Sequence, residues 1–178
     1  SVGLSQPWNF ILVRDPERKK QVHENFRAAR EAEASLFDDE RQQRYRALKL
    51  EGILDAPLNL LITCDQNRGG PVVLGRTRQP MTALYSTVCA VQNLWLAARA
   101  EGLGVGWVSI LDEESLRTIF DLPEAVTPVA YLCLGYVSEF LDQPELVEKK
   151  WGQRLPLEEL VFVDGWQKKD DGLLAALT

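Results

Sequence analysis

The stretch from Met81 to Ala100 places the strongest constraint on the fold of this chain. Its mostly apolar positions recur every three or four residues, which is the spacing of one face of an α-helix. Gly102 follows, and glycine readily adopts the left-handed conformation that ends many helices. The sequence therefore predicts a central core helix over residues 81–100. The recurring positions are Met81, Leu84, Tyr85, Val88, Val91, Gln92, Trp95 and Ala98.

Short apolar runs elsewhere in the chain are typical of β-strands. Asp15 and Pro16 begin a predicted helix that extends to about Ala34, a second helix is expected at roughly 39–51, and Asp112 caps a short one that extends to about Phe120. Strands separated by helical crossovers indicate a layered α/β or α+β architecture. We expect residues 1–178 to form a single domain. The predicted strands are Trp8–Val13, Leu58–Cys64, Val105–Ile110 and Val129–Val137.

Composition excludes several classes of partner. The net charge is -6 and the pI is about 4.9, whereas nucleic acids and anionic membranes attract basic surfaces. No apolar run reaches the ~20 residues that span a bilayer, and no signal segment opens the sequence. Cys64, Cys89 and Cys133 form no metal-binding or disulfide pattern, so we expect three buried thiols in a reducing compartment, the cytoplasm.

The common catalytic motifs are missing from the sequence. The single histidine, His23, falls on a charged helix and is expected at the surface, which disfavours a zinc site. The glycine-rich run from Gly102 to Gly106 ends a helix and opens a strand, the reverse of a dinucleotide-binding turn. An enzyme with these features needs a cofactor that carries the chemistry.

Four segments could bind such a cofactor, although each also has an ordinary structural explanation. The small and polar residues of Ser1–Trp8 allow a planar ring to approach, or simply form a turn before a strand. Ser109 offers a hydroxyl and an N–H at a strand end, or caps the next helix. Arg154, beside a proline, suits bidentate phosphate contacts, or is solvated. Arg76 and Arg78 in the long loop could close over an anion, or be solvated.

Taken together, nine segments are similar to the nitroreductase family, and in particular to the branch that forms 5,6-dimethylbenzimidazole. The similarity covers about residues 1 to 166. The segments are Ser1–Phe10, Leu48–Pro57, Thr63–Asp65, Arg68–Gly70, Val73–Thr77, Leu84–Gly102, Gly104–Ile110, Leu132–Tyr136 and Trp151–Leu157.

The resemblance implies an α+β, nitroreductase-like FMN-binding fold with a central, mostly antiparallel sheet flanked by helices. It also implies a homodimer with exchanged C-terminal tails, whose two FMN sites are built from both chains. In this branch reduced FMN reacts with O2 and is broken into the benzimidazole, the lower ligand of vitamin B12, and erythrose 4-phosphate. The positions implied in the site are Ser1 and Gly3 at the isoalloxazine ring, Lys49 and Leu50 on the ribityl or pyrimidine side, Ser109 as the catalytic residue, and Arg154 at the phosphate.

One family feature has no counterpart in the printed sequence. The family opens with a helix and an Arg-Arg-Asp-x-Arg segment, whose arginines bind the phosphate and whose aspartate takes part in flavin breakdown. The run from Arg14 to Arg18 does not replace that segment, because it follows the first strand. The resemblance therefore implies that the printed chain lacks about a quarter of the family domain. Weaker FMN binding and impaired catalysis are expected without it.

Two other functions remain open at this point. One is a nitro- or quinone-reductase that uses FMN with NAD(P)H and keeps its flavin through turnover. The other is a flavin-binding module without catalysis. The long loop at Asp65–Pro80 favours the flavin-fragmenting enzyme, because it resembles the lid of that branch. For such an enzyme, two ways to reduce FMN stay open: reduction by NAD(P)H, or reduction by a separate flavin reductase.

Overall fold

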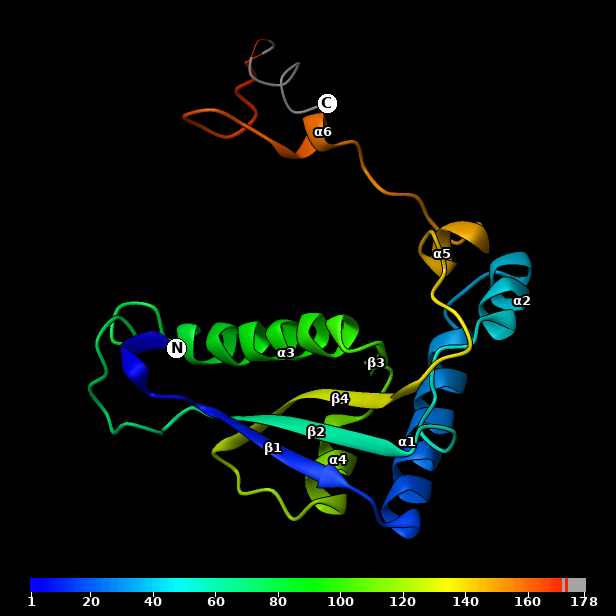
Figure 1. Ribbon diagram of the computed structural model, residues 1–178, viewed down its shortest axis with the longest axis horizontal. Helices are drawn as coiled ribbons and strands as arrows, with labels where there is room; N and C mark the ends of the chain where they lie inside the picture. Colours follow the sequence, from blue (N-terminus) through cyan, green and yellow to red (C-terminus); the bar gives the residue numbers. More distant parts are fainter. Residues whose placement is uncertain (171, 173–178) are drawn as a thin grey trace. The chain divides into compact units, whose positions relative to one another are not determined.

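The computed structural model describes residues 1–170 and 172, and the chain divides into two compact units, Ser1–Phe140 and Leu141–Thr178 (Figure 1). The described part of the second unit holds two single-turn helices, α5 (Glu145–Glu148) and α6 (Leu157–Leu160). The first unit contains the β-sheet and the remaining helices. The single-domain interpretation stays a prediction.

The first unit is built on a four-stranded sheet in the order β1-β2-β4-β3. Every neighbouring pair is antiparallel, which confirms the mostly antiparallel sheet expected from the resemblance. β2 is central and carries side chains that are buried from Asn59 to Cys64. A register shift at Ile62 and Thr63 interrupts its pairing with β4. The strands are β1 (Trp8–Val13), β2 (Leu58–Asp65), β3 (Leu103–Val108) and β4 (Val126–Tyr136).

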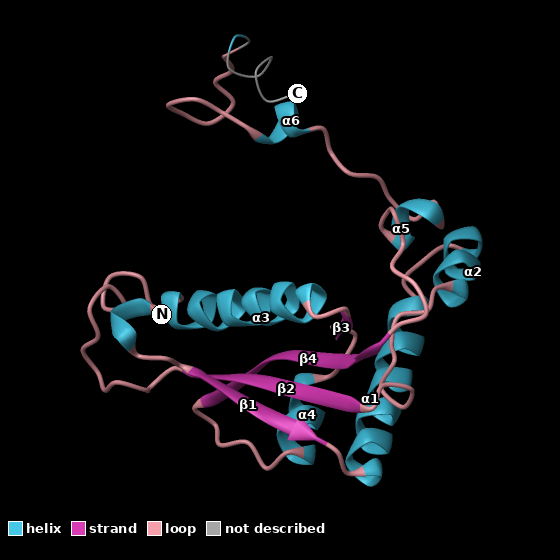
Figure 2. Ribbon diagram, in the orientation of Figure 1, coloured by secondary structure: helices cyan, strands magenta, loops and turns pink. Residues whose placement is uncertain are grey.

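Helices cover both faces of this sheet (Figure 2). α3 (Thr82–Ala100) packs on one face, whereas α1 (Pro16–Ala34) and α4 (Glu113–Ile119) pack on the other. Because side chains alternate along a strand, Leu61 enters the core beneath α1 and α4, and its neighbour Ile62 enters the core beneath α3. Both side chains are fully buried, so the sheet separates two apolar cores.

The N-termini of α1 and α4 are capped as the sequence predicts. Asp15 accepts a hydrogen bond from the Glu17 N–H at 3.0 Å, and Asp112 accepts one from the Ser115 N–H at 2.8 Å. Gly102, with φ of +76°, supplies the left-handed residue that follows α3. These local signals set where the helices begin and end, whereas tertiary packing decides which face of each helix is buried.

The second helix is shorter than the predicted range of 39–51. α2 spans Asp39–Ala47, and Leu48 is already extended, with φ of -75° and ψ of 137°. The reason lies in α1, where the Arg30 guanidinium donates hydrogen bonds to the carbonyl oxygens of Arg46 at 2.9 Å and Leu48 at 2.8 Å. Capping those carbonyls from outside ends the helix, so Lys49 lies in an irregular segment.

The central helix was predicted with nearly correct bounds, but only part of the predicted core stripe faces the sheet. Met81, Tyr85 and Val88 from the predicted core stripe are exposed. Val91 and Ala98 of that stripe are buried as predicted, together with Ala83 and Thr87, whose small side chains allow a close approach of helix and strands. The outer face is nevertheless uncharged until Arg99.

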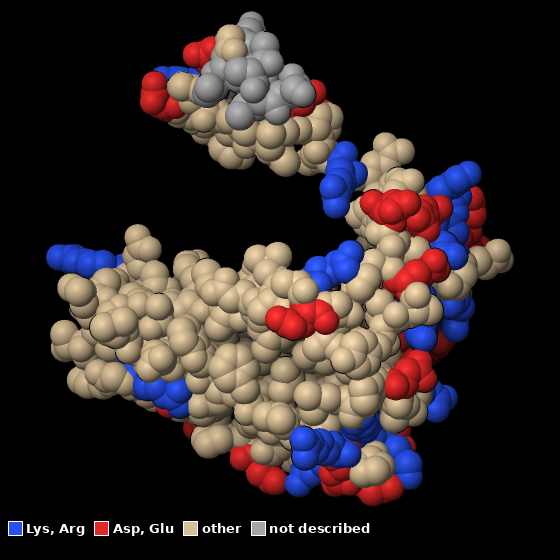
Figure 3. All heavy atoms as spheres, viewed as in Figure 1, with Lys and Arg blue, Asp and Glu red and all other residues tan. Residues whose placement is uncertain are grey.

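Figure 3 shows the same contrast on the molecular surface, where charged side chains gather over α1 and α2 and leave the body of the first unit largely uncharged. Among residues 1–170 and 172, no helix has both the length and the apolar character needed to cross a bilayer.

The three thiols do not share one environment, contrary to prediction. Cys64 and Cys133 are buried, but Cys89 is exposed on the outer side of α3. Burial raises the pKa of the Cys133 thiol to about 11 and also raises the pKa of Cys64. These two thiols are therefore protonated at neutral pH, which makes them poor nucleophiles.

Candidate functional site

A groove of about 380 Å³ lies where the N-terminus meets α3. A short 3-10 helix, η1 (Val2–Leu4), forms one wall. The Val2 N–H donates to the Ser86 hydroxyl at 3.0 Å, and the Gln6 N–H donates to the Ser1 hydroxyl at 3.0 Å. These bonds fix the first residues against the helix. The groove is lined by Ser1, Val2, Trp8, Thr82, Tyr85, Ser86, Cys89, Ala90 and Asn93.

The side chains that line this groove include no acidic or basic residue, and they combine hydroxyl and amide groups with two aromatic rings. Ligand sites commonly have volumes of ~300–1,000 Å³ and combine apolar walls with a few polar groups. A planar, uncharged ring system with carbonyl and N–H edges suits these donors and acceptors. The residues present therefore fit the isoalloxazine part of FMN, whereas the lining residues include no Lys or Arg side chain for its phosphate.

Gly3 is required by packing within the protein itself. Its φ is +51°, and an added Cβ would lie 2.6 Å from Val73 Cγ1 and 3.0 Å from the Leu74 carbonyl oxygen. The loop that follows β2 therefore closes directly onto η1. Gly3 does not line the groove, although it allows Ser1 and Val2 to do so.

Substituting Gly3 by alanine is expected to lower the free energy of unfolding by about 2–4 kcal/mol, because a left-handed backbone and a steric clash add together. Gly102→Ala is the matched control, since its φ is also positive and its added Cβ meets nothing within 4 Å. That control should lose only about 1–2 kcal/mol. Urea denaturation compares the two variants, and equal losses would contradict the clash.

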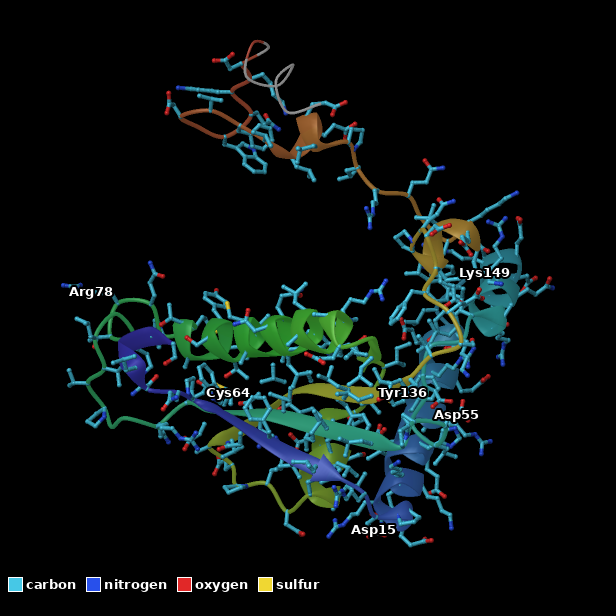
Figure 4. All side chains as sticks on the ribbon, viewed as in Figure 1. Asp15, Asp55, Cys64, Arg78, Tyr136 and Lys149 are labelled. Atoms are coloured by element: carbon cyan, nitrogen blue, oxygen red, sulfur yellow. The ribbon has the colours of Figure 1, made fainter. Side chains whose placement is uncertain are left out.

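Arg76 does not reach for an anion, nor is it solvated. It is buried, and its guanidinium donates to the carbonyl oxygens of Arg68, at 2.8 Å, and Gly70. Arg78 is exposed and extends from the outer end of the loop (Figure 4). The loop is thus shaped by an internal arginine, and Arg78 remains the cation available to solvent-borne ligands.

Lys49 and Leu50 lie at the other end of the sheet from the groove. They precede the start of β2, near Asp55, whereas Cys64 marks the opposite end of that strand (Figure 4). The Lys49 ammonium forms an exposed ion pair with Asp55 at 2.9 Å, and Leu50 packs against the core beneath α1.

Ser109 is exposed immediately after β3, which ends at Val108 rather than at the predicted Ile110. It lines a separate hollow of about 230 Å³ together with Trp107, Glu113 and Tyr131. Its hydroxyl is therefore accessible from the surface, in a position that a ligand or a second chain can cover.

Arg154 lies in the second unit, between α5 and α6, and is exposed. Of the predicted site residues in the first unit, only Ser1 lines the groove, with Gly3 behind it. The remaining predicted site residues lie on other surfaces of the first unit or in the second unit.

The sequence alone did not reveal the polar side chains that line the groove or that hold the segment around Lys49. Thr82 and Ser86 were absorbed into an expected core helix, although both line the groove. Lys19 and Asn59 are buried polar residues that hold the segment around Lys49. An asparagine within the apolar run of β2 was the signal that pointed to such a contact.

Comparison with known proteins agrees with this architecture. Residues 1–136 match the sequence profile of the nitroreductase family, and the chain belongs to that family. Its relatives include a 5,6-dimethylbenzimidazole synthase of Rhodospirillum rubrum, which is 44% identical over 156 residues, covering 88% of this chain and 74% of that protein. A 5,6-dimethylbenzimidazole synthase of Rhodobacter capsulatus is 41% identical over 159 residues, covering 89% of this chain and 76% of that protein.

Solved structures confirm the fold. The NADPH:FMN oxidoreductase of Vibrio harveyi superposes with a TM-score of 0.63 at 19% identity, covering 99% of this chain and 66% of that one. At this identity the likeness concerns the architecture alone. The fold and the family expected from the sequence are therefore both confirmed.

Proposed function

We propose that this protein is a 5,6-dimethylbenzimidazole synthase, which uses O2 to fragment reduced FMN into the lower ligand of vitamin B12 and erythrose 4-phosphate. The observation that carries this proposal is the 44% and 41% identity to two proteins of that name, over 88% and 89% of the chain. The groove beside α3 supports it, because its lining suits an isoalloxazine ring.

FMN supplies the redox-active ring, and the side chains of the protein bind and orient it. A hydroxyl can accept and donate at once, so Ser1 can donate to the ring while it accepts from the Gln6 N–H. Ser109 approaches the ring from the end of β3 and donates or relays a proton there. Lys49 and Leu50 contact the ribityl or pyrimidine side, and Arg154 binds the phosphate.

A second copy of the chain completes each site in this proposal. Within the first unit Ser1, Lys49 and Ser109 lie on separate surfaces. The outer face of α3 carries no charge until Arg99, and Leu96 on it is 60% exposed. In the described residues β1 pairs on one side only, with β2, so its free edge can accept an extended tail. We therefore propose a homodimer with exchanged C-terminal tails.

Leu96→Glu is expected to weaken the dimer about hundredfold or more, because each interface would bury unpaired carboxylates. Leu36→Glu is the matched control, since Leu36 is 80% exposed in the charged region between α1 and α2. Light scattering across a dilution series measures the mass of each variant. A Leu96→Glu protein that stays as dimeric as the control would remove α3 from the interface.

The direct test uses the full natural chain. The protein is mixed with FMN, the flavin is reduced, air is admitted, and absorbance and chromatography follow the flavin and the benzimidazole. Stoichiometric loss of flavin with appearance of 5,6-dimethylbenzimidazole is the expected result. Return of intact oxidised FMN with peroxide alone would overturn the proposal, and turnover of nitro substrates with NAD(P)H would then identify a reductase rather than a flavin carrier.

The source of electrons is part of the same proposal. We place the protein in the cytoplasm, where either NAD(P)H or a separate flavin reductase reduces the FMN. Adding NAD(P)H without a reductase distinguishes these two sources of electrons. In that mixture the protein forms benzimidazole only if NAD(P)H reduces its FMN directly.

A further inference from the structure

The segment 48–57, which joins α2 to β2, contains neither helix nor strand, yet a buried lysine holds its end. Lys19 on α1 is 9% exposed, and its ammonium donates to the carbonyl oxygens of Ala56 at 2.7 Å and Pro57 at 3.2 Å. A cation loses hydration when it is buried, and a buried apolar residue is often no less stable there. The role of Lys19 therefore lies in its hydrogen bonds to segment 48–57 rather than in the packing of α1 alone.

The other end of the segment is held from the same helix. Arg30, about three helical turns after Lys19 and thus on the same face of α1, donates to the Leu48 carbonyl oxygen at 2.8 Å. Its guanidinium lies 5.8 Å from the ring centroids of both Phe26 and Tyr45, which fix its position. Two cations on one rigid helix therefore set the entry and the exit of the segment.

The middle of the segment is tied to the central strand. The Asn59 amide donates to the Ile53 carbonyl oxygen at 2.8 Å and to the Tyr131 hydroxyl at 3.0 Å. Asn59 and Ile53 are fully buried. At the surface, the Lys49 ammonium reaches Asp55 across the same turn. Side chains thus hold this irregular segment at both ends and in the middle.

We infer that Lys19 is a positioning residue for the flavin site, holding segment 48–57 so that Lys49 and Leu50 meet FMN in one conformation. This inference rests on the proposed function, which places those two residues against the flavin. Lys19 acts through the backbone and does not touch the ligand. If segment 48–57 adopts the FMN-binding conformation for only a fraction of the time, the apparent affinity for FMN falls by that fraction. Lys19 therefore raises the affinity by excluding the alternative conformations.

The test replaces Lys19 by methionine, which keeps an apolar stem but removes the donors, and by arginine, which keeps a cation. Lys20→Met is the matched control, because Lys20 is the exposed neighbour on α1 and pairs with Glu17. Three quantities are measured on each protein: hydrogen exchange in residues 48–57, the dissociation constant for oxidised FMN from fluorescence quenching, and the midpoint of urea unfolding.

In Lys19→Met we expect exchange in segment 48–57 to accelerate about tenfold, and the FMN dissociation constant to rise about tenfold with it. Lys19→Arg should recover most of both quantities, and Lys20→Met should leave both unchanged. If Lys19→Met does not fold, Lys19→Arg decides the matter, because a partly restored clamp must show intermediate exchange together with intermediate FMN affinity.

Two results would overturn the inference. Faster exchange with unaltered FMN affinity would make Lys19 a purely structural residue, and unaltered exchange would show that it does not hold the segment. These readouts use oxidised FMN and require no turnover. A wild-type protein that binds FMN but returns it intact after reduction and aeration would overturn the proposed function, while the exchange and affinity data still decide the role of Lys19.

Discussion

Replacing Ser109 by alanine is expected to slow benzimidazole formation by about 10²- to 10⁴-fold, the range typical of a lost proton-transfer group. Ser109 lies past the end of β3 and is exposed, so removing its hydroxyl leaves no buried partner unsatisfied. FMN affinity and thermal stability should therefore stay close to those of the wild type. Single-turnover reactions of enzyme-bound reduced FMN with air measure the rate.

Ser138→Ala serves as the control for Ser109→Ala, because Ser138 is also exposed and lies outside both hollows described above. It should form the benzimidazole at the wild-type rate. Undiminished product from Ser109→Ala would rule out the proton-transfer role. A parallel loss of FMN binding would instead make Ser109 a binding residue.

Phe26→Ala is expected to destabilise the protein by about 3–5 kcal/mol, the usual cost of truncating a buried phenylalanine. Phe26 is 2% exposed in the core between α1 and the sheet, and Arg30 stacks over its ring. The substitution leaves a cavity and also frees the arginine that caps α2. Urea unfolding monitored by circular dichroism gives the change in free energy.

The matched control for Phe26→Ala is Gln21→Ala, one exposed position on the same helix. It should change stability by no more than about 0.5 kcal/mol. A loss below about 1 kcal/mol in Phe26→Ala would mean that the core collapses around the gap, and that Phe26 does not anchor α1.

Local patterns were sufficient to predict most of the fold. The apolar runs of β1 and β2 and the capping residues Asp15 and Asp112 act on their immediate neighbours, so their effects are visible in the sequence. The buried face of α3 could be predicted only in part, because apolar residues occur on both of its sides. Only the contact with the sheet selects Val91 for the inside and leaves Tyr85 outside.

The candidate site was less predictable because its determinants are distant in the sequence. Position 3 must be glycine because an added Cβ would clash with Val73, and Arg30 on the preceding helix sets the end of α2. Neither contact leaves a local pattern. The positions of Lys49, Ser109 and Arg154 came from family resemblance, and their assembly around one flavin remains a prediction.

The strand order has a consequence for how the chain is made. β2 (Leu58–Asp65) pairs with β1, which precedes it, and with β4 (Val126–Tyr136), which leaves the ribosome much later. Until β4 emerges, the nascent chain can form only the β1–β2 pair, in which β2, the more buried strand of the finished sheet, has an open edge. Completion of the sheet is therefore delayed until most of the first unit has been synthesised, and the open edge of β2 is exposed to aggregation during that interval.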